Sequence, residues 1–234
     1  MGTGLYRKPL FRTAGDRGLL MELGNAIDPD INNRVRAVAE KLSAETPSGV
    51  VEVIPTYCSI ILQYDPAVTS PDSLMACLTA MEKTIVVDEL PPRETVELPV
   101  CYDTSLGPDL EHVAEVNALS VDEVIQLHTA PLYPVYMIGF APGFPYLGGL
   151  SEKLHTSRLA SPRSRVPAGS VGIANNQTGI YPIDSPGGWQ LIGRCPERLF
   201  DPERKNPILL QAGSLLRFTP ISLEEFYRLK GGQP

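Results

Sequence analysis

The stretch "IGFAPGFPYLGGL", Ile138 to Leu150, combines four glycines, two prolines and three aromatic residues with no charged residue. It lies within Pro131 to Gln190, where 17 of 60 residues are glycine or proline. Short apolar runs such as "SVGIA" and "WQLIG" interrupt this region. Short strands separated by many turn residues are typical of small β-barrels with long loops. The sequence therefore predicts a mainly-β domain, built as a closed or half-closed barrel.

The first 88 residues have a different pattern. "PLFRTAGDRGLLMELG" predicts two strands joined by a turn, and "GVVEVIPTYCSIILQYD" predicts two more strands that break at Pro55. Between these pairs, Asp28 to Ala44 places apolar residues at helical spacing, and Ser70-Pro71 begins a second helix. The order strand, strand, helix, strand, strand, helix predicts an α+β domain with helices packed on an antiparallel sheet.

A linker is predicted between the two domains. The segment "DELPPRETVELP", Asp88 to Pro99, carries three prolines and several acidic residues, a composition typical of a semi-rigid linker. We therefore predict an α+β domain over 1–88, a linker over 89–98 and a barrel domain over 99–234. Within the barrel domain, Gly107 to Ala130 predicts a helical pair, and the second helix begins with the capping box Ser120 to Glu123.

Composition narrows the possible functions. With 43% hydrophobic and 20% charged residues among 234, the chain resembles an ordinary globular protein. Its net charge of −7 disfavours binding to nucleic acid or to an anionic membrane. The sequence has no apolar run long enough to span a membrane and no signal-peptide pattern, so we expect a soluble, cytoplasmic protein. The four cysteines lie far apart and are expected to be reduced thiols.

Few residues suit catalysis. The three histidines lack metal-ligand spacing, and there is no phosphate-binding glycine motif. His128 shares the apolar face of its helix with Val124 and Ile125, which favours a hydrogen-bonded packing role. The sequence "AGSVG" around Ser170 is one glycine short of a nucleophile elbow and lacks the strand-to-helix context. The chain by itself therefore resembles an incomplete enzyme.

Positive charge gathers in one window. Lys153 to Ile183 contains no acidic residue but includes Lys153, Arg158, Arg163 and Arg165. Prolines flank the last two arginines in "SPRSRVPAGS" and restrict the backbone that carries them. Because guanidinium groups suit carboxylates and phosphates, Arg163 and Arg165 are candidates for an anion or substrate site. A solvated barrel loop and a protein-docking surface are the alternatives.

The uncharged loops could form the walls of a pocket. Phe140, Phe144, Tyr146 and Trp189 supply aromatic surface, and the neighbouring glycines let a ligand approach the backbone. A pocket also needs a few convergent polar groups, and the nearby candidates are Gln177, Thr178, Tyr181, Ser185 and Gln190. The alternative is that these loops only close one end of the barrel.

Two long motifs resemble a known family. "GFAPGFPYLGGL" and "SPRSRVPAGSVGIANNQTGIYPIDSPGGWQLIGRCPERLFDP" closely resemble the B subunit of 5-oxoprolinase. The family is also called allophanate hydrolase subunit 1 and includes the sporulation kinase inhibitor KipI. The resemblance extends through "VELPVCYD", "LSVDEVIQLH" and "GDRGLLMELG". Two positions depart from the usual pattern: Asn175-Asn176 stand where a glycine often appears, and Cys195 stands where threonine is expected.

The resemblance implies a fold and a heteromeric complex. The fold is an α+β N-terminal domain followed by a mainly-β, cyclophilin-like barrel. The partners are a KipA-like C subunit, which has a related barrel, and an A subunit. Together they form a hydrolase that uses ATP to open 5-oxoproline to glutamate. This chain alone is expected to bind no cofactor or metal. Fused B and C proteins form the carboxyltransferase part of urea carboxylase, with the site between the two halves.

The resemblance also assigns residues, but no catalytic one. In the first loop it points to Gly139, Phe140, Pro142, Gly143, Phe144 and Tyr146 as pocket or partner residues. The further candidates are Arg163, Arg165, Pro167, Gln177, Thr178, Tyr181, Ser185, Pro186, Gly187, Gly188, Trp189 and Gln190. We expect half of a composite site that is inactive without the C subunit. The alternative is a KipI-type inhibitor that docks on a histidine kinase and blocks its autophosphorylation.

Overall fold

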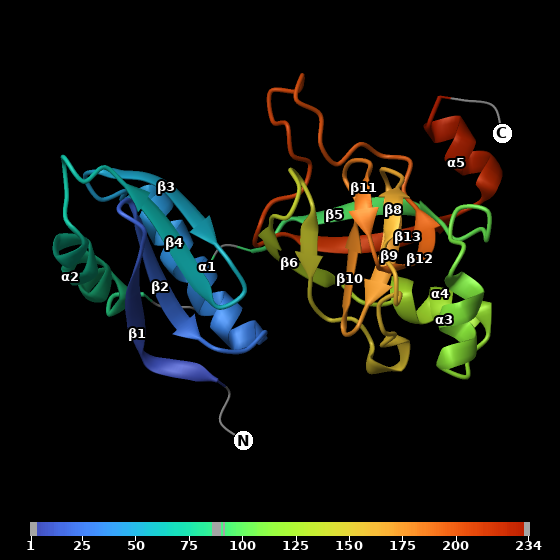
Figure 1. Cartoon of the computed structure of the whole chain (residues 1–234), viewed down its shortest axis with the longest axis horizontal. Helices are drawn as coiled ribbons and strands as arrows, with labels where there is room; N and C mark the ends of the chain where they lie inside the picture. Colours follow the sequence, from blue (N-terminus) through green and yellow to red (C-terminus); the bar gives the residue numbers. More distant parts are fainter. Residues whose placement is uncertain (1–3, 86–89, 91, 232–234) are drawn as a thin grey trace. The chain divides into compact units, whose positions relative to one another are not determined.

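The computed structural model describes residues 4–85, 90 and 92–231. The chain divides into two compact units, Met1–Pro92 and Arg93–Pro234, each with its own core (Figure 1). All four cysteines are free. Among the described residues, the helices are too short or too polar to cross a membrane.

The first unit is a four-stranded sheet covered by two helices. Its strands are β1 (Leu5–Ala14), β2 (Gly18–Gly24), β3 (Val50–Pro55) and β4 (Ser59–Tyr64), and its helices are α1 (Pro29–Ala44) and α2 (Pro71–Glu82). The strand order is β1-β2-β4-β3, with antiparallel pairing throughout. Side chains cap both helices: Asp28 accepts from the amides of Asp30 and Ile31, and Ser70 accepts from that of Ser73. A proline in the first turn suits each helix start, because its missing N–H would have no intrahelical partner there.

The second unit is a closed seven-stranded barrel, which confirms the predicted barrel. In spatial order its strands are β10 (Gln177–Ile180), β7 (Pro145–Leu147), β6 (Tyr133–Ile138), β13 (Leu215–Ile221), β5 (Thr95–Cys101), β12 (Gln190–Arg194) and β9 (Ser170–Ala174). Strands β5 and β13 pair in parallel, and the other pairs are antiparallel. A separate two-stranded ribbon joins β8 (Arg163–Val166) to β11 (Ser185–Gly187).

Helices flank the barrel. They are α3 (Leu110–Val116), α4 (Val121–Thr129), the short 3-10 helix η2 (Glu152–Leu154) and α5 (Leu223–Leu229). Helix α3 packs against β12, α4 packs against β13, and the two helices pack against each other (Figure 1). The capping box predicted at the start of α4 is present: Ser120 Oγ accepts from the Glu123 amide, and the Glu123 carboxylate accepts from the Ser120 amide. The structure therefore contains the helical pair expected over 107–130.

The linker expected over 89–98 overlaps a barrel strand. Strand β5 begins at Thr95, which lies opposite Leu215 of β13. The prolines and acidic residues of this stretch suggested a linker, but pairing with a strand about 120 residues away along the chain orders its second half. Residues 86–89 and 91 of the expected linker lie outside the described residues. The division into 1–88, 89–98 and 99–234 stays a prediction.

A polar network crosses the barrel core. His128 is fully buried, and its Nδ1 and Nε2 atoms lie 2.7 Å from Tyr102 Oη and 2.9 Å from Thr178 Oγ1. Its ring stacks on Phe218, with 4.6 Å between the centroids. Burial lowers the pKa of His128 to about 3, so the imidazole is neutral. The hydrogen-bonded packing role predicted for this histidine is confirmed.

Candidate functional site

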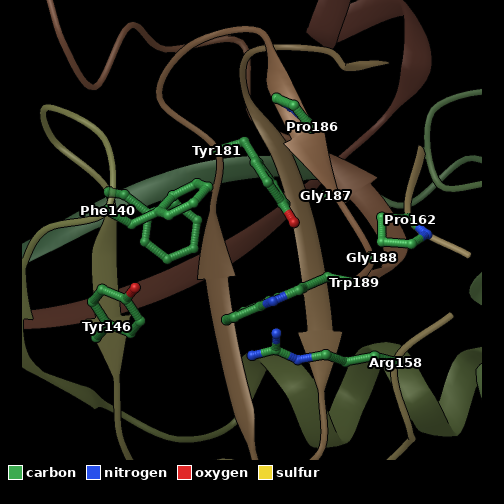
Figure 2. Close-up of a pocket in the computed structure, with 10 residues that line it drawn as sticks. Phe140, Tyr146, Arg158, Pro162, Tyr181, Pro186, Gly187, Gly188 and Trp189 are labelled. Atoms are coloured by element: carbon green, nitrogen blue, oxygen red, sulfur yellow. The ribbon is translucent and has the colours of Figure 1, made fainter. Parts of the chain in front are cut away.

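The aromatic pocket is a cavity of about 280 Å³ in the second unit. It is lined by Phe140, Phe144, Tyr146, Arg158, Pro162, Tyr181, Pro186, Gly187, Gly188 and Trp189 (Figure 2). Seven of these residues belong to the two uncharged loops that the sequence singled out, and Tyr181, one of the candidate polar groups, follows β10. Arg158 and Pro162 complete the lining. The structure therefore brings together the separate segments "GFAPGFPY" and "SPGGW" around one cavity.

Phe144 forms the centre of the pocket wall. It is 2% exposed, and its ring makes edge-to-face contacts with Phe140, Tyr146, Tyr181 and Trp189 at centroid distances of 5.1 to 5.6 Å. Glycine at 179 allows this packing, because a Cβ atom there would lie 3.1 Å from Trp189 and 3.2 Å from Phe144. Such edge-to-face clusters hold rings in fixed orientations. The wall is therefore formed before any ligand arrives.

Phe140 stands at the rim of the pocket in a strained turn. Its φ is +66°, and the Ala141 amide donates to the Gly139 carbonyl across it at 2.8 Å, which makes a γ-turn. The side chain is 69% exposed and contacts the Phe144 ring. A positive φ costs a residue with a Cβ atom about 1–2 kcal/mol. The Gly139 amide donates to the Phe144 carbonyl and closes the surrounding turn. This turn keeps the Phe140 side chain exposed at the rim despite that cost.

Arg158 is the pocket's cation. Two hydrogen bonds fix its backbone: Gln190 Nε2 donates to Ser157 O at 2.9 Å, and Leu159 N donates to Gly188 O at 2.8 Å. Ser157 and Leu159, which flank Arg158, are thus hydrogen-bonded to Gln190 and Gly188, which flank Trp189. The Arg158 guanidinium carbon lies 6.0 Å from the Trp189 ring centroid, and Figure 2 shows the two side chains running side by side. Among the described residues, no carboxylate forms an ion pair with Arg158.

Two tyrosine hydroxyls share the pocket with this cation. Burial raises the pKa of Tyr146 and of Tyr181, and the charge of Arg158 partly opposes both shifts. A hydrogen bond with the Trp189 backbone also lowers the pKa of Tyr181. Both hydroxyls stay protonated at neutral pH and can donate hydrogen bonds. No aspartate, glutamate, histidine, cysteine or lysine is among the ten lining residues. The pocket can therefore bind a small, flat ligand with one anionic group, but it holds no general base of suitable pKa.

The structure does not bring Arg163 and Arg165 to the pocket. Arg163 Nη2 contacts the two carboxylate oxygens of Asp109 at 2.7 and 2.9 Å, and its Nη1 donates to Trp189 O at 3.2 Å. Arg165 pairs with Asp184, at 2.9 Å from Nε. Asp184 lies one residue beyond the acid-free window, and Asp109 lies 54 residues before Arg163. Neither partner lies in the acid-free window, so the sequence pattern did not show that both arginines are paired with carboxylates.

Other predicted residues support the site without lining it. Thr178 is fully buried and bonds to His128 and to the Gly172 carbonyl inside the barrel. Gln190 anchors the Arg158 segment through its amide, as above. Among the described residues, Ser185 Oγ and Gln190 Oε1 are buried without a hydrogen-bond partner. The residues that remain apart from the lining are Gly139, Pro142, Gly143, Arg163, Arg165, Pro167, Gln177, Thr178, Ser185 and Gln190.

In the sequence, Arg158 stands out only as a member of the basic window over Lys153 to Ile183. This window could have identified Arg158, because it places several cations between the two aromatic loops. The prolines around Arg163 and Arg165 favoured those two arginines, which the structure pairs with Asp109 and Asp184. Ser170, considered as a nucleophile, is 1% exposed within strand β9. Within the part of the chain that the structure describes, no three His, Cys, Asp or Glu side chains gather as a possible metal site.

Comparisons with known proteins give a consistent family. A family model described as carboxyltransferase domain, subdomain C and D, matches residues 9–210. The 5-oxoprolinase B subunit of Bacillus subtilis (strain 168) is 42% identical over 226 residues, which cover 92% of this chain and 94% of the relative. The 5-oxoprolinase B subunit of Haemophilus influenzae is 54% identical over 129 residues, covering 55% of this chain and 61% of the relative.

Solved structures are similar as well. The crystal structure of TTHA0988 gives a TM-score of 0.78 at 39% identity, over 88% of this chain and 40% of that chain. PH0987 from Pyrococcus horikoshii gives a TM-score of 0.57 at 44% identity, over 93% of this chain and 100% of that chain. The urea carboxylase of Kluyveromyces lactis gives a TM-score of 0.72 at 23% identity and shares the fold, over 93% of this chain and 22% of that chain.

Proposed function

This chain belongs to the carboxyltransferase C-D domain family, together with proteins named as the B subunit of 5-oxoprolinase, and we propose that it is the B subunit of an ATP-dependent 5-oxoprolinase complex. The complex would convert 5-oxo-L-proline, ATP and water to L-glutamate. The names of the relatives favour this role over inhibition of a histidine kinase. The proposal includes the C and A subunits as partners, a cytoplasmic location, and a cyclophilin-like barrel behind an α+β domain.

The aromatic pocket carries the mechanistic part of the proposal. 5-Oxoproline is a small lactam ring with one carboxylate, and the pocket combines aromatic walls with one arginine that has no carboxylate partner among the described residues. Arg158 would pair with the substrate carboxylate, while Trp189 and Phe140 would pack against the ring. The hydroxyls of Tyr146 and Tyr181 would offer hydrogen bonds to the lactam. These contacts bind and orient a substrate and exclude water from it.

The reacting groups would come from elsewhere in the complex. Because none of the pocket's lining residues can act as a base near neutral pH, this chain would supply half of a composite site and the C subunit the other half. Binding energy from the pocket would then position the lactam for ATP-dependent opening by the assembled enzyme.

Reconstitution tests the assignment. Purified chain would be assayed for glutamate formation from 5-oxoproline and ATP alone, with the C subunit, and with the C and A subunits together. We expect turnover only when all three proteins are present. Turnover by the isolated chain would show that the composite-site proposal is wrong. A complex of the C and A subunits that works equally well without this chain would show that it is not the B subunit.

A further inference from the structure

The second unit contains another pocket, here called the basic pocket, with a volume of about 450 Å³. It lies where the end of β12, the following loop and the end of α5 meet. Its charged lining residues are Arg194, Glu197, Arg198, Arg204 and Lys230. It shares no lining residue with the aromatic pocket. In a chain of net charge −7, four cations around one cavity form a local reversal of charge.

Arg194 and Lys230 are two like charges in the lining of the same pocket. Arg194 Nε donates to the Ala168 carbonyl at 2.8 Å, which fixes the direction of the guanidinium. Partial burial lowers the pKa of both groups, and the charge of Arg194 further lowers that of Lys230. Neither forms an ion pair with a carboxylate of the described residues. Asp184 partly offsets both shifts, but its carboxylate already bonds to Arg165 and to the Ala168 amide.

The other charges leave the pocket positive. Arg198 and Arg204 share one carboxylate, Asp201, at 3.7 and 3.4 Å. Asp201 itself is not among the lining residues, and Glu197 is the acidic residue that is. Burial raises the pKa of Cys195, which also lines the pocket, to about 12, so its thiol stays neutral. Asp201 is thus taken by Arg198 and Arg204, and Asp184 by Arg165, so among the described residues the lining cations without an ion pair to a carboxylate are Arg194 and Lys230.

We propose that the basic pocket binds a phosphoryl group, either as inorganic phosphate or pyrophosphate or at the phosphate end of a nucleotide. A guanidinium presents a planar fork of donors that matches phosphate oxygens, and an ammonium adds a point charge with three donors. A doubly charged tetrahedral anion between Arg194 and Lys230 removes their mutual repulsion, whereas a single carboxylate would neutralise one of them. This site goes beyond the proposed function, because it needs neither 5-oxoproline nor a partner protein.

Isothermal titration calorimetry with the full purified chain tests the proposal. Inorganic phosphate, pyrophosphate and ATP would be titrated separately, and acetate at the same ionic strength would serve as the reference anion. We expect saturable binding of the phosphoryl ligands that weakens as sodium chloride is raised. Binding of all three indicates recognition of the phosphoryl group itself, and binding of ATP alone indicates a nucleotide source.

Variants locate the binding. Lys230→Gln and Arg194→Gln should each weaken it at least tenfold. Arg228→Gln is the matched control, because it removes the same charge from α5 but its side chain pairs with Glu225 and lies outside the pocket lining. Lys230 follows the last residue of α5 and is exposed, so Lys230→Gln remains informative if Arg194→Gln fails to fold. Phosphoryl ligands that bind no better than acetate, or binding that is unchanged in Lys230→Gln, would overturn the proposal.

Discussion

The guanidinium of Arg163 contacts both carboxylate oxygens of Asp109, from Nη2 at 2.7 and 2.9 Å. Asp109 also accepts a hydrogen bond from the Leu191 amide at 2.6 Å, and Arg163 Nη1 donates to Trp189 O. The pair therefore connects β8, the residue before α3, and β12. Trp189 lines the aromatic pocket and Leu191 packs in the same cluster, so Arg163, a candidate for anion binding, also supports one wall of this pocket.

Removal of this carboxylate should destabilise the protein. Asp109→Ala leaves Arg163 and the Leu191 amide without their acceptor in a largely buried place, which we expect to lower the free energy of unfolding by about 2–4 kcal/mol. Urea unfolding of the isolated chain measures the change. Glu97→Ala is the control, because it breaks an exposed pair with Arg217 and should cost less than about 1 kcal/mol. Equal losses in the two variants would contradict a structural role for Asp109.

His128 should make stability depend on pH. Its pKa is about 3 in the folded protein and near 6.5 when unfolded, so below pH 6.5 the unfolded chain binds a proton that the folded protein does not. The stabilisation is complete above pH 6.5 and is lost as the pH falls toward 3, by up to about 1.4 kcal/mol for each pH unit. Urea unfolding between pH 7.5 and 5 avoids most carboxylate titration. His128→Gln should flatten this dependence, and a flat wild-type profile would refute the prediction.

Local features of the fold could be predicted from the sequence. The Ser120 capping box depends on residues within one helical turn, where spacing determines which groups meet. The burial of His128 follows from its place on the apolar face of α4, although its hydrogen-bond partners Tyr102 and Thr178 lie elsewhere in the chain. The family pattern that often places glycine near Asn175 also has a local cause. The φ of Asn175 is +52°, a left-handed conformation that glycine adopts without strain and asparagine tolerates better than most residues.

Long-range pairing could not be predicted in the same way. The barrel closes through β5 and β13, whose pairing begins at Thr95 and Leu215, and nothing near Thr95 in the sequence identifies that partner. The same applies to the charges of the site. Arg158 and Arg163 lie in one basic window, and only the fold places Asp109 beside the second and the Trp189 ring beside the first.

Phe140 should show separable effects on stability and activity. Phe140→Ala and Phe140→Gly both remove a mostly exposed ring, so burial changes little in either. Because φ is +66°, the glycine variant should be more stable than the alanine variant by about 1 kcal/mol in urea unfolding. Both variants should lower turnover of the reconstituted complex to a similar extent, because both remove the aromatic rim. An alanine variant as stable as the glycine variant would argue against strain at this position.

Arg158 should determine affinity for the substrate carboxylate. Arg158→Met keeps much of the apolar stem against Trp189 but removes the charge, so in the reconstituted complex we expect the KM for 5-oxoproline to rise at least tenfold. The value of kcat should change less, because the group holds the substrate and does not react. Arg158→Lys should restore part of the affinity.

Arg217→Met is the matched control for this experiment, since Arg217 is exposed, pairs with Glu97 and does not line the aromatic pocket. Gel filtration of each variant with its partner proteins separates a loss of assembly from a loss of substrate binding. A normal KM in a fully assembled Arg158→Met complex would show that the aromatic pocket does not bind the substrate carboxylate. The assignment of this chain to the complex would still stand, because it is tested by whether turnover requires this chain at all.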